Sequence, residues 1–392
     1  MSITRTFSKK WALLLGALSI AVIAVALWNL FQKRFLVSGV TCFAYRDINR
    51  NGIYDMQDRP YAGLKVTLER PKGKAAKKES NISGFANFDM SKGHKRSEIH
   101  SPGEYTFHAE APSDCEITSG NTTQTITIRA HDAAVAGLIA ERLLEPVGVA
   151  PRLQISGSVK LDQSLLASSH SILRATSPTG DVFPVPISTS GRYSFPAAAG
   201  NWHLDLTGSD GKTKSRELSV NGYPVVLSQM DRDTFPPRAN AKLKIIGFDQ
   251  LTSSDTLCEI PNGYEGFNWR NWVATHHKFY QGNGYINATV SSEYVAYTSA
   301  GHPATFSSPV PFDFVGAYVG AAWPETEKAD VVVRGWRQDR QVYEDRFRVS
   351  ISGPLYFNAD YREVTRVEFA SESYRQIVID DLACRMGVTP AE

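Results

Sequence analysis

The residues best suited to chemistry lie in one stretch of twelve, from Asp47 to Asp58. Oxygen-bearing side chains occupy its positions 1, 3, 5, 9 and 12, and glycine occupies position 6; these residues are Asp47, Asn49, Asn51, Asp55, Asp58 and Gly52. This spacing lets a short loop wrap a calcium ion, because alternate side chains turn inward and glycine permits the sharp turn. Ile53, at position 7, would offer its backbone carbonyl. The sequence therefore predicts a calcium site, with Asp58 in place of the usual glutamate; the alternative is an Asx-rich turn without metal.

A catalytic centre has less support. His276 and His277 form the only adjacent pair of histidines, and the chain contains no H-E-x-x-H, G-x-S-x-G or phosphate-loop motif. Asp and Glu are plentiful, so a carboxylate pair for glycoside hydrolysis remains a minor alternative. We expect a protein that is not an enzyme.

The segments around the loop predict strands instead of the helices of an EF-hand. Residues 37–45 are apolar and β-branched, and residues 63–69 alternate between apolar and polar side chains. Residues 38–130 resemble the SD-repeat B-type and collagen-adhesin B-type modules of bacterial surface proteins, which are small β-sandwiches that often carry a D-x-N-x-N-G-x-x-D loop. The resemblance implies that calcium stiffens this module and performs no chemistry.

Residues 11–31 are uncharged and mostly aliphatic, which predicts a transmembrane helix. At about 1.5 Å per residue the stretch reaches about 31 Å, the thickness of a bilayer core. Three basic residues precede it and two follow it, which favours a cytoplasmic N-terminus. Signal-peptide cleavage after residues 24–26 is the alternative. Either way, we expect the rest of the chain in the periplasm or on the cell surface.

Four cysteines bracket two segments: Cys42 and Cys115 enclose the first, and Cys258 and Cys384 enclose the last. An even number without a C-x-x-C pair predicts disulfides Cys42–Cys115 and Cys258–Cys384 outside the cytoplasm. The alternative is four buried thiols. The net charge of +2 without a strong basic cluster excludes a charge-driven nucleic-acid partner.

The segment 152–230 opens with alternating residues and continues with G-x-Y-x-F at residues 191–195 and G-x-W-x-L at residues 200–204. This order resembles the carboxypeptidase-regulatory-like β-sandwich. Pro146 and Pro151 predict a linker in front of it.

The last segment carries the motifs Phe248-Asp249-Gln250-Leu251, then Ile260 to Trp272, then Asp380-Asp381-Leu382. Over residues 245–385 they resemble the FDDL, IPNGYGGFNWSN and DDL motifs of a secreted jelly-roll module. In the related galactose-binding-like jelly rolls, acidic residues of the first and last strands hold a structural calcium. The resemblance implies Asp249 and Asp381 as its ligands here, although Gln250 replaces the second aspartate of the opening motif.

Three aromatic residues in this segment, Trp269, Trp272 and Tyr264, are candidates for binding a sugar. Flat rings beside Asn, Glu and Arg provide an apolar platform with a hydrogen-bonding rim. The alternative is that the rings fill the core of the sandwich.

We therefore expect an all-β fold: three β-sandwich modules in series behind one N-terminal transmembrane helix. The parts are a cytoplasmic tip and anchor in the lipid bilayer (1–35), a calcium-loop sandwich (36–145), a middle sandwich (152–230) and a jelly-roll module (241–392). The expected function is a non-catalytic stalk and binding head that attaches to or organises surface polysaccharide. The alternative is a structural subunit of an envelope assembly that binds protein partners, which full burial of Trp269 and Trp272 would favour.

Overall fold

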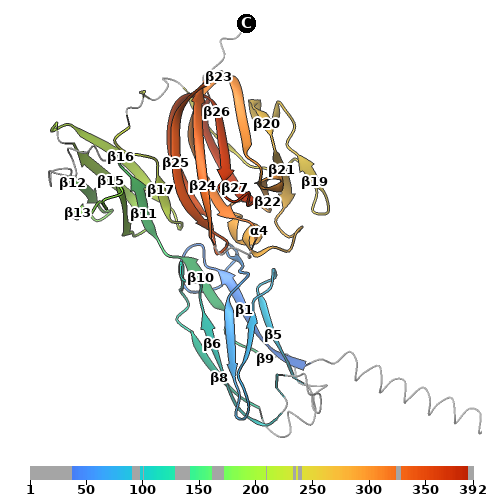
Figure 1. Ribbon diagram of the computed structural model, residues 1–392. Helices are drawn as coiled ribbons and strands as arrows, with labels where there is room; N and C mark the ends of the chain where they lie inside the picture. The colour runs from blue at the N-terminus through green and yellow to red at the C-terminus, as the bar shows by residue number, and fades with distance from the viewer. Residues whose placement is uncertain are drawn as a thin grey trace, which may run out of the picture.

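The computed structural model describes residues 38–90, 98–99, 101–128, 142–160, 172–208, 210–232, 235–236, 241–323 and 328–386. Within these residues, strands form nearly all of the regular structure. The exceptions are the short helix α4 (Asn283–Ala288) and two single 3-10 turns, Tyr264–Gly266 and Ser299–Gly301. The predicted all-β fold class is confirmed, and Figure 1 shows the strands gathered into three bodies that touch one another.

The first module packs two sheets around one core. In the larger sheet, β1 (Ser38–Arg46) pairs with β2, β5, β9 and β10, and the second sheet has the order β4-β3-β6-β8. Alternation explains the packing: in β3 (Lys65–Glu69), Val66 and Leu68 are buried while the two end residues are exposed. The other strands are β2 (Arg59–Pro60), β4 (Ala76–Glu79), β5 (Phe85–Met90), β6 (Gly103–Glu110), β7 (Cys115–Ile117), β8 (Thr123–Ile128), β9 (Arg142–Leu143) and β10 (Val147–Pro151).

This module extends further than the sequence suggested. All five residues of β10 are buried, and the strand pairs with β1 in parallel and with β7 in antiparallel orientation. The expected linker between Pro146 and Pro151 is therefore wrong. The two prolines bound a fully buried strand, a position that costs the sheet few hydrogen bonds because strand ends tolerate a missing N–H.

The middle module is a smaller sandwich. One sheet has the order β13-β12-β15-β16, and β14, β11 and β17 form the facing layer. Its core contains Trp202, Phe195 and Leu204. The strands are β11 (Gln154–Ser158), β12 (Ile172–Thr176), β13 (Val182–Val185), β14 (Arg192–Pro196), β15 (Gly200–Thr207), β16 (Thr213–Val220) and β17 (Val225–Leu227).

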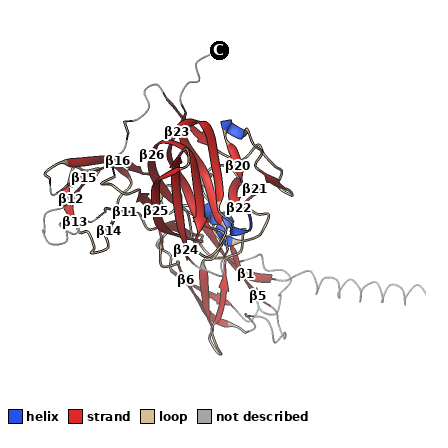
Figure 2. Cartoon of the chain, turned by 45° about the horizontal axis from the view of Figure 1, so that its top comes forward, coloured by secondary structure: helices blue, strands red, loops and turns tan. Residues whose placement is uncertain are grey.

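Long, bent strands build the C-terminal module (Figure 2). The pairing of β23 with β26 shifts register between Ser307 and Gly316, a stretch that contains Pro309 and Pro311. Prolines cannot donate to the ladder, and such bulges bend strands, so these two strands curve around the core. The strands are β18 (Lys242–Ile246), β19 (Leu257–Glu259), β20 (Asn268–Arg270), β21 (Trp272–His276), β22 (Tyr294–Thr298), β23 (Ala304–Ala321), β24 (Lys328–Arg337), β25 (Arg340–Ser350), β26 (Leu355–Ser371) and β27 (Ile377–Met386).

The three modules are not arranged in a simple series. Strand β17 of the middle module pairs in parallel with β26, with Val225 opposite Tyr356, so one sheet runs through both modules. The first module contacts the C-terminal module directly, because Cys115 Sγ lies 3.9 Å from the Ser352 carbonyl oxygen. Each module therefore touches both of the others, as the contacts of Arg46 described below also require.

The predicted disulfides are wrong: all four thiols are free. The registers Ala44↔Val147 and Pro151↔Cys115 place Cys115 six residues further along the sheet than Cys42. This offset is roughly 20 Å, whereas a disulfide needs Cα atoms within about 7 Å.

In the second predicted pair, Cys258 lies on β19 and Cys384 lies on β27. Strands β21 and β22 lie between these two strands. Cys258 and Cys384 are therefore three strand spacings apart, which is about 14 Å or more and too far for a disulfide. Each pair brackets a module in the sequence without being adjacent in its sheet.

No helix within the described residues is long and apolar enough to cross a membrane. The predicted anchor at residues 11–31, with the whole segment 1–35, lies outside the described residues.

Candidate functional site

The predicted calcium loop, residues 47–58, connects β1 to β2. These two strands pair at the base of the loop, with Arg46 opposite Arg59 and Tyr45 opposite Pro60. The Asp47 N–H donates to the Val149 carbonyl at 3.0 Å, which fastens the start of the loop to β10. Both ends of the loop are therefore held within the first module.

The two terminal carboxylates turn inward. Asp47 is 1% exposed and accepts hydrogen bonds from the N–H groups of Asn51 (3.1 Å) and Gly52 (2.8 Å). Asp58 accepts from the N–H groups of Ile48 and Asp55, both at 3.0 Å. Gly52 has φ of +74°, and a Cβ there would lie 2.9 Å from the Thr118 carbonyl oxygen. Position 6 of the loop therefore requires glycine for two reasons: its backbone is left-handed, and a side chain there would collide with the Thr118 carbonyl.

The side chains at positions 3, 5 and 9 meet. The amide nitrogens of Asn49 and Asn51 donate to the same oxygen of Asp55, Oδ2, at 2.8 and 3.1 Å. The remaining oxygen of Asp55 accepts from the Gln57 N–H at 2.9 Å. Rotation of the two amide groups would direct their oxygens toward the point where the nitrogens now converge.

Negative charge accumulates in the loop without a neutralising side chain. Within the described residues, Asp47, Asp55 and Asp58 form no ion pair with Lys, Arg or His. Burial, and then the charges of these three carboxylates, raise the pKa of Tyr45 to about 12. Burial also raises the pKa of Asp58 above its ordinary value. A divalent cation would relieve this uncompensated charge.

The donors present fit calcium, which takes carboxylate, amide and backbone carbonyl oxygens. Within the described residues, no three His, Cys, Asp or Glu side chains form a metal-binding cluster. Calcium in this loop would therefore have to use the oxygens of Asn49 and Asn51 and the carbonyl of Ile53 beside the carboxylates. Calcium stays a prediction here.

Arg46, the residue before the loop, lies where the three modules meet. Its side chain is 2% exposed, and Nη1 donates to the Asn287 carbonyl of α4 at 2.7 Å. The guanidinium carbon lies 5.9 Å from the centre of the Tyr223 ring, which belongs to the middle module. Nε and Nη2 are buried and have no hydrogen-bond partner within the described part of the chain. One side chain of the first module thus contacts both other modules.

Arg59, the residue after the loop, makes a second contact with the C-terminal module by donating from Nη1 to the Ser292 carbonyl. The buried side chain of Asn287 completes this interface: its Nδ2 donates to the Ala62 carbonyl at 2.9 Å, and its Oδ1 accepts from the Ala62 N–H at 3.3 Å. The two residues that flank the loop are therefore also residues that dock the first module onto α4 and its following turn.

The second predicted calcium pair, Asp249 and Asp381, is brought to one place. Asp381 accepts from the Ser291 hydroxyl at 2.6 Å, and Asp249 accepts from the Glu293 N–H at 3.2 Å. Burial, partly offset by the Ser291 hydrogen bond and augmented by Asp249, raises the pKa of Asp381. The adjacent Asp380 is 1% exposed and accepts from the Val290 and Ser291 N–H groups. Asp249 and Asp381 thus both accept hydrogen bonds from residues 290–293. Calcium between them remains a prediction.

The proposed sugar platform is wrong. Trp269 is 5% exposed and Trp272 is 1% exposed, and both belong to the core of the C-terminal module. Trp269 Nε1 donates to the Tyr264 carbonyl at 2.9 Å, while the Tyr264 hydroxyl donates to the Gly247 carbonyl at 2.7 Å. Antiparallel pairing of β20 with β23 covers Trp269 with Phe306. The two tryptophan rings therefore fill the core, as the alternative expected, and the partly buried Tyr264 packs against it.

The adjacent histidines also serve the fold. His276 Nε2 lies 3.1 Å from a Glu293 carboxylate oxygen. His277 is buried, and burial together with the neighbouring His276 lowers its pKa to about 3, so its ring is neutral. Within the described residues, neither histidine is hydrogen-bonded to a hydroxyl or thiol that could serve as a nucleophile.

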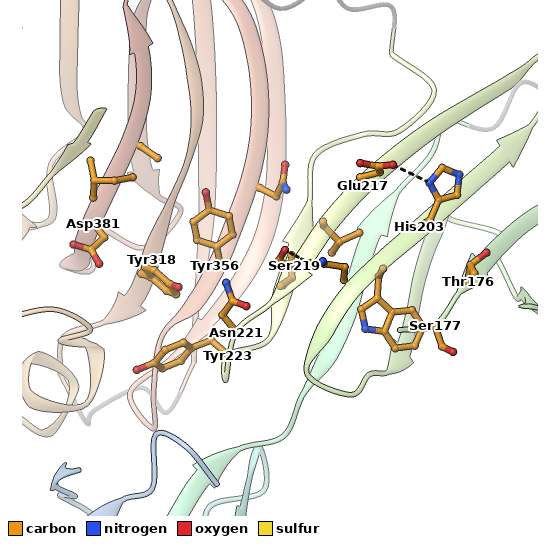
Figure 3. A pocket seen from close by; sticks show the side chains of 17 residues that line it. Thr176, Ser177, His203, Glu217, Ser219, Asn221, Tyr223, Tyr318, Tyr356 and Asp381 are labelled. Carbon is orange, nitrogen blue, oxygen red and sulfur yellow. Dashed lines mark hydrogen bonds and ion pairs between the residues drawn. The ribbon is translucent and has the colours of Figure 1, made fainter. Parts of the chain in front are cut away.

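A cleft of about 790 Å³ lies between the middle and C-terminal modules (Figure 3). The C-terminal side contributes Tyr318, Tyr356 and Asp381, and the middle module contributes His203 and Glu217. Sequence reasoning missed this site. Its lining residues are isolated side chains spread over eight different strands, so no local motif identifies them.

No known family model matches the chain. A local alignment is 31% identical over 97 residues to serine-aspartate repeat-containing protein F of Staphylococcus epidermidis, covering 25% of this chain and 6% of that protein. The chain therefore spans only a small part of the length of this relative. The match supports the SD-repeat resemblance for a quarter of the chain, and the resemblances of the other modules remain predictions.

Two solved structures share weak similarity. A shaft pilin from Lactobacillus rhamnosus GG is 12% identical and aligns over 51% of this chain and all of its own, with a TM-score of 0.22. The Bacillus anthracis TIE protein is 9% identical over 84% of this chain and 51% of its own, with a TM-score of 0.23. Scores this low establish neither a shared topology nor a shared function.

Proposed function

We propose that this chain is a non-catalytic structural protein of the bacterial cell envelope, anchored through residues 11–31 and displaying one rigid body. In this proposal calcium bound to loop 47–58 stabilises the junction between the three modules. The observation that carries it is that Arg46 and Arg59 have two roles. They pair with each other at the base of the loop, and each donates a hydrogen bond to the C-terminal module.

The calcium loop is connected to the contact between the modules through the chain itself, because Arg46 and Arg59 directly precede and follow the loop. Calcium would draw the inward side chains of the loop together and hold its two ends in one arrangement. Because Arg46 and Arg59 flank the loop, the same arrangement directs one guanidinium group toward α4 and the other toward the turn that follows α4. Buried, charge-assisted hydrogen bonds of this kind depend strongly on geometry, so a loosened loop should weaken the docking.

The connection between the other two modules supports a rigid body. Beside the β17–β26 pairing, Arg232 Nη1 lies 3.0 Å from the buried Asp345 carboxylate, which also accepts from the Gln229 N–H at 2.9 Å. Flexible domains usually meet through smaller, more polar contacts. A body with a shared sheet and a buried ion pair suits load-bearing or spacing of a surface assembly.

The burial of Trp269 and Trp272 favours this structural role over a tryptophan-based polysaccharide head. A location outside the cytoplasm follows from the predicted anchor and from the SD-repeat resemblance. Protein partners in the envelope are part of the proposal.

Hydrogen exchange of the full-length chain tests the proposed coupling. Calcium should slow amide exchange in α4 and residues 289–292, although these lie more than 200 positions from the loop in sequence. Strands β24 and β25, which pair with each other and through β24 with β26, serve as the internal control. The Asp55→Asn variant keeps the side-chain shape but removes one ligand charge, and it should abolish the effect of calcium.

An equal exchange rate in α4 with calcium and with chelator would overturn the coupling. Protection limited to the first module would leave calcium in the loop and remove its role at the junction.

A further inference from the structure

One wall of the cleft between the middle and C-terminal modules is built of three tyrosines. The Tyr318 ring lies between two others, with ring centres 5.1 Å from Tyr223 and 5.0 Å from Tyr356. Among the described residues, none of these three hydroxyls forms a hydrogen bond. Burial raises the pKa of Tyr356 to about 12 and that of Tyr318 further, so both phenols stay protonated and able to donate.

The opposite wall, from the middle module, is lined mainly by polar side chains. Asn221 lies between the modules, and its side chain forms no hydrogen bond with any described residue (Figure 3). Ser219 and Asn201 line the middle-module side. Ile245 adds an apolar surface from β18, with 54% of the residue exposed. No Lys or Arg lines the cleft within the described residues, and its charged groups are Asp381 and Glu217 beside His203.

We infer that this cleft binds a neutral oligosaccharide. Aromatic rings and an isoleucine suit the apolar faces of pyranose rings, while free phenol and amide groups suit their hydroxyls. The volume of about 790 Å³ falls within the range of roughly 300–1,000 Å³ found for small-molecule sites. The inference rests on the proposed non-catalytic surface role and adds a ligand to it.

The charge of the cleft excludes other ligands of similar size. Among the described residues, a phosphate, sulfate or uronate group entering it would meet two carboxylates and no Lys or Arg, so acidic polymers are disfavoured. The free donors are side-chain groups scattered over both walls, which suits a hydroxyl-rich ligand better than a peptide. Peptides are recognised chiefly through a continuous row of backbone groups along one strand edge.

Titration calorimetry of the full-length chain in detergent, with calcium present, tests this assignment. The probes are hexasaccharides of β-1,4-linked glucose, mannose and N-acetylglucosamine, a galacturonate hexamer and a set of extended heptapeptides. We expect at least one neutral hexasaccharide to bind, and galacturonate and peptides not to bind.

Two cleft variants and two matched controls locate the site. Tyr356→Phe removes only a hydroxyl and should weaken binding about three- to tenfold, the effect of losing one hydrogen bond. Ile245→Asn removes the apolar surface and should weaken it about tenfold. Leu243→Asn, on the same strand and 53% exposed outside the cleft, and Tyr374→Phe, on a tyrosine 69% exposed elsewhere, should bind as the unaltered chain does.

Melting temperatures of all four variants show whether each is folded. The assignment is overturned if no neutral hexasaccharide binds, if galacturonate or peptides bind instead, or if both cleft variants bind normally. The calcium effect on α4 exchange is measured without sugar, so the two failures are distinguishable. Loss of sugar binding with the calcium effect present overturns this inference alone, whereas loss of the calcium effect overturns the proposed junction.

Discussion

Calcium should raise the melting temperature of the full-length chain by an amount that reports how many modules unfold together. A ligand that binds only the folded state stabilises it by RT ln(1 + [L]/Kd), about 2.7 kcal/mol at a hundredfold excess over Kd. This free energy changes the melting temperature in inverse proportion to the unfolding entropy, which grows with the number of residues in the cooperative unit.

The two possible units give different shifts. If the three modules unfold as one body of about 350 residues, the unfolding entropy is about 0.7 kcal/mol/K and calcium raises Tm by about 4 °C. If the first module of about 115 residues unfolds alone, the entropy is about 0.24 kcal/mol/K and the shift is about 11 °C. The buried contacts of Arg46, Asn287 and Asp345 favour the single transition and the smaller shift.

Differential scanning calorimetry with calcium and with chelator measures both the shift and the enthalpy. Asp55→Asn should remove the calcium shift. Asp210→Asn is a matched control, because Asp210 accepts a backbone N–H two residues ahead at 3.0 Å as Asp55 does at 2.9 Å, but lies in a separate turn. Identical melting curves in the two buffers would refute the calcium site. A separate early transition shifted by about 11 °C would refute the rigid junction.

Three further predictions address the core, the thiols and the pH dependence. Trp272→Ala should destabilise the chain by about 3–5 kcal/mol in chemical denaturation, because a fully buried indole is lost; a change below about 1 kcal/mol would contradict its core position. A thiol reagent should titrate four groups in the unreduced, denatured chain and react fastest with half-buried Cys258 in the native one; two or fewer reactive groups after denaturation would restore the disulfides. Burial lowers the pKa of His277 in the folded chain to about 3, whereas its ordinary value of 6.5 applies to the unfolded chain. Above pH 6.5 the ring is mostly neutral in both the folded and the unfolded chain. Below that pH the unfolded chain binds a proton that the folded chain does not. Stability should therefore fall, by up to about 1.4 kcal/mol per pH unit from this group, as pH drops from 6.5 toward 3, and His277→Asn should show a shallower decline in urea unfolding.

Features that depend on neighbours in the sequence were predictable. The alternation in residues 63–69 predicted β3, because a half-buried strand repeats every two residues. The spacing from Asp47 to Asp58 predicted a loop whose side chains converge, and the contacts at Asp55 agree with that convergence. The prediction of a linker at residues 146–151 was wrong. Its two prolines are typical of a linker, but the apolar run Val147–Ala150 between them is typical of a buried central strand, which is what forms.

Only the tertiary structure could decide which faces are covered. Trp269 and Trp272 lie in a Gly/Asn-rich segment that suits a surface loop equally well, until β23 and β26 close over them. Cysteine pairing depended on strand order and register, which place intervening strands between residues that bracket a module. Arg46 gave no local signal, because its hydrogen-bond partner Asn287 lies 241 positions away. Periodicity in the sequence predicts the type of secondary structure and which face of it is apolar. The junction between the modules and the cleft depend on contacts between segments that are distant in the chain, which periodicity does not contain.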